Sequence, residues 1–286
     1  MLSYIHKHLQ AMEADPTVTT LLSARAALRP LGLTDFSATL WDMPIQAYPK
    51  LSELLPPMAP EDVQRLWTGY VGEVLMGQAV NFARALSENY TVVSGKSLRG
   101  SKILDFGCGY GRMLRVLSFY SDEVWGVDPW DESIRVCRSY GLPNVRQSDW
   151  LPESLPVDTN FEIAFAFSVF THLSAKAAGT CLAAMRKHVV DGGVGCITIR
   201  PVEYWRMVWS QQGENWLRDR ERDHDANGFA YVPHNGRPID GEVHYGDASM
   251  TLDWLAKLCQ STGWKVEGTD RTHDDPVQRY VFLSAV

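Results

Sequence analysis

Residues 103–111 read Ile-Leu-Asp-Phe-Gly-Cys-Gly-Tyr-Gly. An apolar run here enters a turn in which glycine occupies every second position, and Asp105 precedes the first glycine by two residues. Gly107 and Gly109 suit a tight turn with backbone angles that other residues avoid, and Gly111 lets a strand and the next helix pack closely. The stretch therefore predicts a strand, a nucleotide-binding loop and the N-terminus of a helix.

The spacing of these glycines separates two classes of nucleotide-binding protein. A dinucleotide-binding loop has the pattern Gly-x-Gly-x-x-Gly, and the position of its third glycine is Arg112 in this chain. The observed Gly-x-Gly-x-Gly spacing, preceded by Asp105, resembles the first motif of class I S-adenosylmethionine-dependent methyltransferases. In that family the loop wraps the methionine half of the cofactor. The missing glycine disfavours the alternative of a nicotinamide-dependent oxidoreductase.

A second acidic residue follows at the distance that the resemblance requires. An apolar strand expected at 124–127 ends in Asp128, 23 positions after Asp105, which is about one helix and one strand of a βαβ unit. We expect both ribose hydroxyls of the cofactor to donate to this carboxylate. The alternative is that Asp128 only caps the helix that begins near Pro129.

The turn after the third expected strand, 144–147, holds Asp149 and Trp150. The resemblance implies that one accepts a hydrogen bond from the adenine amino group and the other covers the ring. A turn-forming aspartate and a core tryptophan are the alternatives. The full set of cofactor contacts that the resemblance implies is Asp105, Gly107, Cys108, Gly109, Gly111, Asp128, Pro129, Asp149, Trp150 and Phe167.

The fourth expected strand, 161–169, is almost continuously apolar, as a strand buried on both faces should be. Its end, Ser-Val-Phe-Thr-His-Leu at 168–173, resembles a segment of methyltransferases often encoded with sugar and natural-product pathways. A helix over 174–188, a fifth strand over 194–199, a helix capped by Ser249 or Thr251, and strands over 264–269 and 280–285 follow. Over 98–286 the resemblance implies an α/β, Rossmann-like seven-stranded sheet with helices on both faces and an antiparallel last strand.

Two regions lie outside this expected core, and substrate choice should depend on them. Residues 1–97 predict an N-terminal helical extension, in which a helical pattern over 61–89 is interrupted by Gly69, Gly72 and Gly77. Trp67 and Tyr70 in that pattern either roof the cofactor pocket or pack on the sheet as an aromatic stripe.

The second region, 201–247, is an insert rich in aromatic residues and histidines. It follows the fifth strand, and ligands of open α/β folds bind beyond the carboxyl ends of strands, so we expect a substrate lid. Alternatively, its aromatic residues form a small core of their own. The candidate substrate contacts are Arg200, Tyr204, Trp205, Tyr245 and Tyr70.

A hydroxyl acceptor needs a general base, and histidine is the usual one near neutral pH. His172, just past the fourth strand, is the first candidate, although the same Thr-His-Leu turn also suits a purely structural role. His234 and His244 in the insert are the alternatives. Arg200 is expected either to orient the acceptor or to pair with an acidic residue of the lid.

Composition limits the remaining possibilities. The formal net charge is −7, opposite to what phosphate neutralisation requires, so nucleic acid is a poor candidate partner. The five cysteines include no Cys-x-x-Cys pair, and the spacing of His224, His234 and His244 matches no compact ligand motif, so we expect no metal. No signal peptide or membrane span is expected, which favours a cytoplasmic enzyme.

The sequence thus predicts S-adenosylmethionine-dependent methyl transfer to a small molecule, with a hydroxyl of a sugar or secondary metabolite as the expected acceptor. The alternatives are a cofactor-binding protein of the same fold without transfer activity, or an N-methyltransferase. The oligomeric state is left open.

Overall fold

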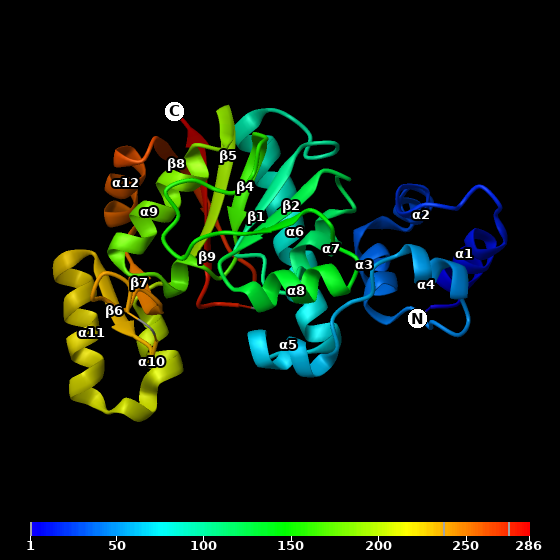
Figure 1. Cartoon of the computed structure of the whole chain (residues 1–286). Helices are drawn as coiled ribbons and strands as arrows, with labels where there is room; N and C mark the ends of the chain where they lie inside the picture. Colours follow the sequence, from blue (N-terminus) through cyan, green and yellow to red (C-terminus); the bar gives the residue numbers. More distant parts are fainter. Residues whose placement is uncertain (1, 237, 274) are drawn as a thin grey trace. The chain divides into compact units, whose positions relative to one another are not determined.

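The structure is a computed structural model that describes residues 2–236, 238–273 and 275–286 (Figure 1). Seven strands form a sheet in the order β3-β2-β1-β4-β5-β9-β8, and a two-stranded sheet pairs β6 with β7. The chain divides into two compact units, Met1–Ser87 with Ser97–Gln147, and Glu88–Lys96 with Ser148–Val286.

The first unit holds the N-terminal helices and three parallel strands. β1 pairs with β2, and β2 with β3, both in parallel. Helices α7 and α8 pack beside β2. The N-terminal helices are α1 (Ser3–Ala14), α2 (Leu21–Leu28), η1 (Arg29–Leu31), α3 (Gly32–Asp42), α4 (Pro49–Leu54) and α5 (Glu61–Thr68). Then come α6 (Gly72–Ser94), whose last turns belong to the second unit, β1 (Ile103–Phe106), α7 (Arg112–Leu117), β2 (Val124–Asp128), α8 (Asp131–Ser139) and β3 (Val145–Gln147).

The glycines in the helical pattern of 61–89 permit a break or close packing, and the structure has a break between α5 and α6. Gly69 and Gly72 there have positive φ angles of 76° and 57°, which glycine adopts at little cost. Gly77 lies inside α6, so it does not end the helix.

The second unit holds the other four strands of the large sheet. β4 and β5 are parallel, and β9 lies between β5 and β8 and is antiparallel to both. The elements are β4 (Phe161–Ala166), η2 (Phe170–His172), α9 (Ala175–Arg186), β5 (Val189–Ile199), α12 (Leu252–Ser261), β8 (Trp264–Asp270) and β9 (Arg279–Ala285). The predicted methyltransferase fold with its antiparallel last strand is confirmed.

Two boundaries differ from the sequence expectation. β5 begins at Val189 and includes the Asp191-Gly192-Gly193 segment that was expected to lie between helix and strand. The pairing of β4 with β5 shifts register next to it, and a Cβ at Gly193 would lie 2.6 Å from Val189 Cγ1, so glycine is needed for this irregularity. Thr251 caps α12 by accepting from Trp254 N–H, whereas Ser249 lies inside β7.

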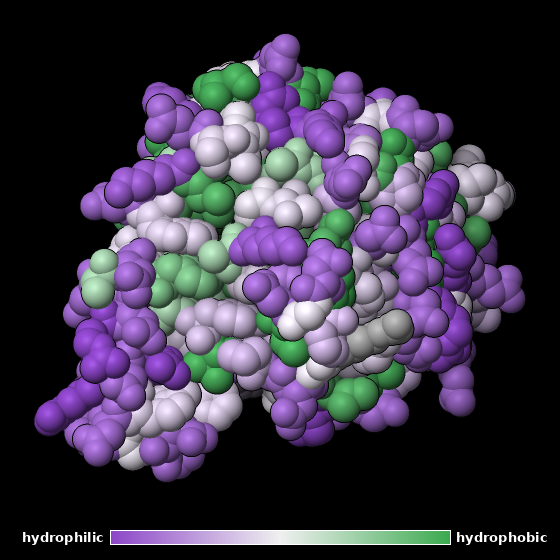
Figure 2. All heavy atoms as spheres, turned by 60° about the vertical axis from the view of Figure 1, so that its left-hand side comes forward, coloured by the Kyte–Doolittle hydropathy of each residue, from purple (hydrophilic) through white to green (hydrophobic). Residues whose placement is uncertain are grey.

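The insert after β5 contains α10 (Glu203–Trp209), η3 (Ser210–Gln212), α11 (Glu214–Asn227), β6 (Phe229–Pro233) and β7 (Gly246–Met250). Its buried residues form a small core, Tyr204, Trp205, Leu217 and Ala230. Opposite charges pair on its surface, where Arg206 contacts Glu214 and Glu221. Figure 2 shows hydrophilic side chains over most of the face in view, including the lower left where α10 and α11 lie.

Candidate functional site

The loop between β1 and α7 in the first unit has the positive φ angles that its glycines predict. Gly107, Gly109 and Gly111 have φ angles of 79°, 52° and 80°. A Cβ at Gly111 would lie 2.3 Å from Leu142 Cδ1 and 3.0 Å from Cys137 Sγ. Only glycine therefore fits at this position, which confirms the close packing expected of Gly111.

Asp128, at the end of β2, is tied to this loop. Its Oδ2 accepts from Gly109 N–H at 2.9 Å, and its Oδ1 accepts from Trp130 N–H at 2.9 Å. Burial raises the pKa of the Asp128 carboxyl, and the two backbone donors act in the opposite direction. The Ser133 side chain donates to the carboxyl as well, so of about four lone-pair positions at least one remains for a further donor.

Asp105 lies in β1 and is almost fully buried. Its Oδ2 has no hydrogen-bond partner among the described residues. Burial, followed by the charge of Asp128, raises the pKa of Asp105 well above its ordinary value. An unpaired buried oxygen of this kind needs a donor, and S-adenosylmethionine brings an ammonium and two ribose hydroxyls. The donor set and the glycine cradle thus fit the cofactor that the sequence predicts.

Aromatic side chains line the outer side of the loop within the same unit. Trp67, from α5, would be 3.5 Å from a Cβ at Gly109, and its ring stacks on Trp130 at 4.8 Å between centroids. Trp67 therefore lies directly on the glycine loop, consistent with a roof over it. Tyr70 is 53% exposed and lies in the turn after α5.

The remaining expected cofactor contacts belong to the second unit. Asp149 and Trp150 are exposed, so the core alternative for Trp150 is wrong. Phe167 follows β4 and its ring meets Tyr280 edge-on at 6.2 Å. The next residue, Ser168, has a φ of 62°, a left-handed backbone that is strained for serine and fixed by a 2.6 Å hydrogen bond from its N–H to Thr198 Oγ1.

The second unit also contains a buried carboxylate, Asp247 of β7, surrounded by donors. Its Oδ1 accepts from Tyr204 Oη–H at 2.8 Å and from Arg200, and its Oδ2 lies 2.9 Å from His234 Nε2. Burial by itself would raise the pKa of Asp247, but these three donors outweigh it and hold the pKa below its ordinary value. Asp247 is therefore ionised near neutral pH.

Both ring nitrogens of His172 are engaged. Its Nδ1 lies 2.7 Å from Gly246 O, which can only accept, so Nδ1 carries the proton. Its Nε2 then accepts from Arg200 Nη2–H at 3.1 Å. Burial, followed by the charge of Arg200, lowers the pKa of His172 to about 4. These contacts tie the turn after β4 to β7, as the structural alternative for the Thr-His-Leu segment requires.

His234 differs from His172 because only one of its two ring nitrogens is hydrogen-bonded to a described residue. Since Asp247 is an ionised acceptor, His234 Nε2 carries the proton and Nδ1 holds the lone pair. The structure shows no hydrogen bond at this Nδ1 within the residues that it describes, and the side chain is 38% exposed. Tyr245, half exposed, stacks on His172 at 5.2 Å and meets His234 edge-on at 5.6 Å.

His244 lies apart from Asp247 in its contacts and is buried. Its Nδ1 is 2.8 Å from Ser174 Oγ, the cap of α9, and its Nε2 is buried without a partner among the described atoms. The ring therefore supports the start of α9.

Three of the expected substrate contacts have structural roles instead. Trp205 is fully buried, and its Nε1–H donates to Ser249 Oγ at 2.7 Å. Tyr204 is also buried in the core of the insert. Both rings thus lie in a small core of the insert, which is the alternative that the sequence left open beside a substrate lid. Arg200 pairs with Asp247, an acidic residue of the insert, which is the second of the two roles expected for Arg200.

Sequence reasoning did not single out Asp247 as a site residue. The signal was a lone acidic residue between apolar and small ones at 246–250, which is unusual for a strand unless the carboxylate has partners.

Among the residues that the structure describes, no three His, Cys, Asp or Glu side chains are grouped as metal ligands would be. None of the helices in the described ranges has the length and apolar character needed to cross a membrane.

Comparison with known proteins agrees with this geometry. Residues 103–193 match the methyltransferase domain family. The ubiquinone biosynthesis O-methyltransferase of Idiomarina loihiensis is 24% identical over 181 residues, covering 54% of this chain and 72% of the relative. An S-adenosylmethionine-dependent methyltransferase from Clostridium acetobutylicum has a similar fold, with a TM-score of 0.52 at 14% identity over 78% of this chain and 96% of the other. A protein from Pyrococcus horikoshii also has a similar fold, with a TM-score of 0.52 at 14% identity over 80% of this chain and 100% of the other.

The glycine loop, the two aspartates and the domain match define a class I methyltransferase domain. The chain is an S-adenosylmethionine-dependent methyltransferase, with S-adenosylmethionine as its cofactor.

Proposed function

We propose that this protein methylates a hydroxyl group of a small molecule and that His234 is the general base. The observation that carries the proposal is the pair formed by His234 and Asp247, in which the buried carboxylate fixes the tautomer of the ring. An orienting acid behind a histidine with a free lone pair is the arrangement that general-base catalysis requires.

The cofactor supplies a methyl group already activated by a sulfonium, so the protein has mainly to bind, align and deprotonate. In the first unit, Asp105, Gly107, Cys108, Gly109, Gly111, Asp128 and Pro129 would hold it. Asp149, Trp150 and Phe167 of the second unit are proposed for its adenosine half. The carboxylate of Asp128 would accept from ribose hydroxyls of the cofactor.

The acceptor step begins with a hydroxyl that donates to His234 Nδ1. Nδ1 would take this proton as the hydroxyl oxygen displaces the sulfonium sulfur from the methyl carbon, so that the C–S bond breaks and S-adenosylhomocysteine leaves, and Asp247 would stabilise the imidazolium through Nε2–H. The partners of Asp247 on its other side, Arg200 and Tyr204, hold the carboxylate in place. His172 and His244 fix the ends of η2 and α9, and the general base first expected at His172 is reassigned to His234 in this proposal.

The class of acceptor is proposed from the surroundings of His234. The half-exposed ring of Tyr245 beside it offers a flat surface of the kind that sugar rings and planar natural products use. The relative from Idiomarina loihiensis is an O-methyltransferase by name, which supports oxygen as the atom methylated. The net charge of −7 argues against nucleic acid as the acceptor.

Transfer of a labelled methyl group from S-adenosylmethionine to a panel of methyl glycosides, catechols and amines tests the proposal. We expect a hydroxyl compound to be methylated, and His234→Gln to reduce kcat by about 10² or more with unchanged affinity for S-adenosylhomocysteine. The matched control is His172→Gln, which should lower stability but keep transfer by the folded enzyme within about tenfold. Methylation of amines alone, insensitive to His234→Gln, would favour the N-methyltransferase alternative.

A further inference from the structure

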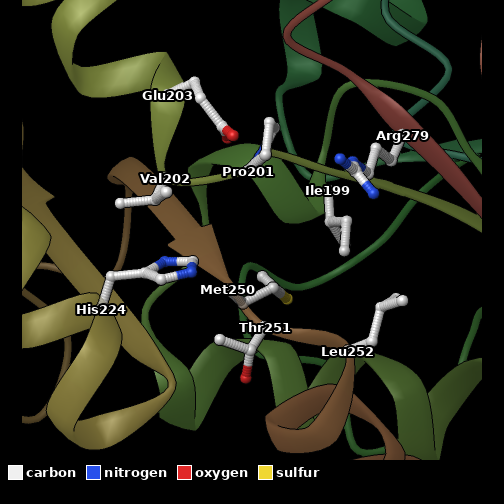
Figure 3. Close-up of a pocket in the computed structure, with 9 residues that line it drawn as sticks. All are labelled: Ile199, Pro201, Val202, Glu203, His224, Met250, Thr251, Leu252 and Arg279. Atoms are coloured by element: carbon white, nitrogen blue, oxygen red, sulfur yellow. The ribbon is translucent and has the colours of Figure 1, made fainter.

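A small cavity in the second unit shares no residue with the His234–Asp247 pair. It has a volume of about 180 Å³ and lies between the end of β5, the start of α10, α11, the β7–α12 junction and the start of β9 (Figure 3). Ligand pockets for drug-sized molecules are about 300–1,000 Å³, so this one suits a smaller ligand. Its apolar lining comes from Ile199, Val202, Met250 and Leu252.

His224 of α11 is the buried polar group of the cavity. It is 5% exposed, and Figure 3 shows its ring directed toward Met250 in the middle of the cavity. Its Nδ1 lies 2.9 Å from Ser249 Oγ, which already accepts from the Trp205 indole N–H at 2.7 Å. The ring also donates to the backbone carbonyl of Ser249, which by itself raises the pKa of His224. His224 is therefore a buried polar group of the cavity wall that is held in place by Ser249.

Two opposite charges line the same cavity. Glu203 lies in the first turn of α10 and Arg279 is the first residue of β9, and Figure 3 shows the charged end of each turned toward the space between them. In the part of the chain that the structure describes, neither belongs to a salt bridge, and the charge of Glu203 acts to raise the pKa of His224. Oppositely charged groups that face one cavity without pairing leave a cation site and an anion site on its wall.

We propose that this cavity binds a small zwitterion, an α-amino acid with an apolar side chain. Its carboxylate accepts from Arg279, its ammonium donates to Glu203, and its side chain lies on Met250 and Leu252. Burial lowers the pKa of His224, so the ring is neutral near pH 7. Because Glu203 and Arg279 are exposed, we expect weak binding as a whole, with a dissociation constant on the order of 1 mM.

Three probes of nearly equal shape separate the charges: L-leucine, 4-methylpentanoate without the amine, and 3-methylbutylamine without the acid. Binding is followed by the NMR signals of the His224 ring in the full-length protein, assigned by their loss in His224→Gln. We expect L-leucine to shift these signals with a dissociation constant in the millimolar range, and the other two compounds to bind at least about tenfold more weakly.

Variants of the two exposed charges keep the fold and complete the test. Glu203→Gln should make 4-methylpentanoate bind as well as L-leucine, and Arg279→Gln should weaken L-leucine by about tenfold. The matched control is Glu242→Gln, an exposed acid of the same unit outside the cavity. No shift at about 20 mM L-leucine, or equal binding of all three probes to the wild type, would overturn the proposal. The measurement needs neither cofactor nor turnover, so it stands or fails independently of the proposed methyl transfer.

Discussion

Replacing Asp247 by asparagine removes one negative charge from a buried network and leaves its shape almost unchanged. The Asp247 side chain is 4% exposed and that of its partner Arg200 is 11% exposed. Removing one member of a buried ion pair typically costs about 3–5 kcal/mol, because the other charge stays buried without compensation. Arg200 keeps its bond to Thr171 O at 3.0 Å and its position over the Tyr204 ring at 4.0 Å. We therefore expect the lower end, about 3 kcal/mol.

The assay is urea unfolding at pH 7, followed by circular dichroism and tryptophan fluorescence. The matched control is Asp240→Asn, which removes an exposed pair with Lys176 and should cost less than about 1 kcal/mol. The wild type should also lose stability in acid, since the pKa of Asp247 is lowered in the folded state and its contribution disappears as pH falls through that pKa. A free energy of unfolding for Asp247→Asn within about 0.5 kcal/mol of the wild type would refute the reasoning.

Three further predictions follow from other parts of the structure. The pKa of His172 is lowered from 6.5 to about 4, so the unfolded chain binds a proton at this ring more tightly than the folded protein does. The free energy of unfolding should therefore fall by up to about 3 kcal/mol as pH falls from 6.5 to 4. In urea titrations, His172→Gln should lack this part of the loss of stability in acid. Gly111→Ala should destabilise by about 2–4 kcal/mol through its positive φ and the clash with Leu142, whereas Gly192→Ala, with a positive φ and open space, should cost only about 1–2 kcal/mol in the same assay. Trp205→Ala should cost about 3–5 kcal/mol by opening the core of the insert, measured by urea unfolding, and a change in KM with unaltered stability would return Trp205 to the substrate site.

The sequence predicts the sheet well because its strands carry strong local signals. The almost continuous apolar character of β4 and the glycines after β1 both appear as expected. The β6–β7 pair was not expected, because a register between 229–233 and 246–250 depends on contacts that no local pattern encodes.

The candidate site, like the fold, could be predicted from the sequence only in part. The loop, Asp105 and Asp128 follow from spacing along the chain, which a fixed βαβ unit translates into position. The roles of the histidines do not follow from spacing. Whether a ring can act as a base or only holds two segments together depends on the group that faces each of its nitrogens. The nitrogens of His172 contact Gly246 O and Arg200, whereas His234 uses one nitrogen on Asp247, and the sequence does not show this difference.

Calorimetric titration with S-adenosylhomocysteine and with NAD tests the central claim most directly. The account predicts that the wild type binds S-adenosylhomocysteine and not NAD. In Asp128→Ala, checked for folding by circular dichroism, the loss of two charge-assisted hydrogen bonds should weaken binding by about 2–4 kcal/mol, roughly 30- to 700-fold. Binding of NAD in preference to S-adenosylhomocysteine, or an unchanged affinity of the folded Asp128→Ala protein, would contradict it.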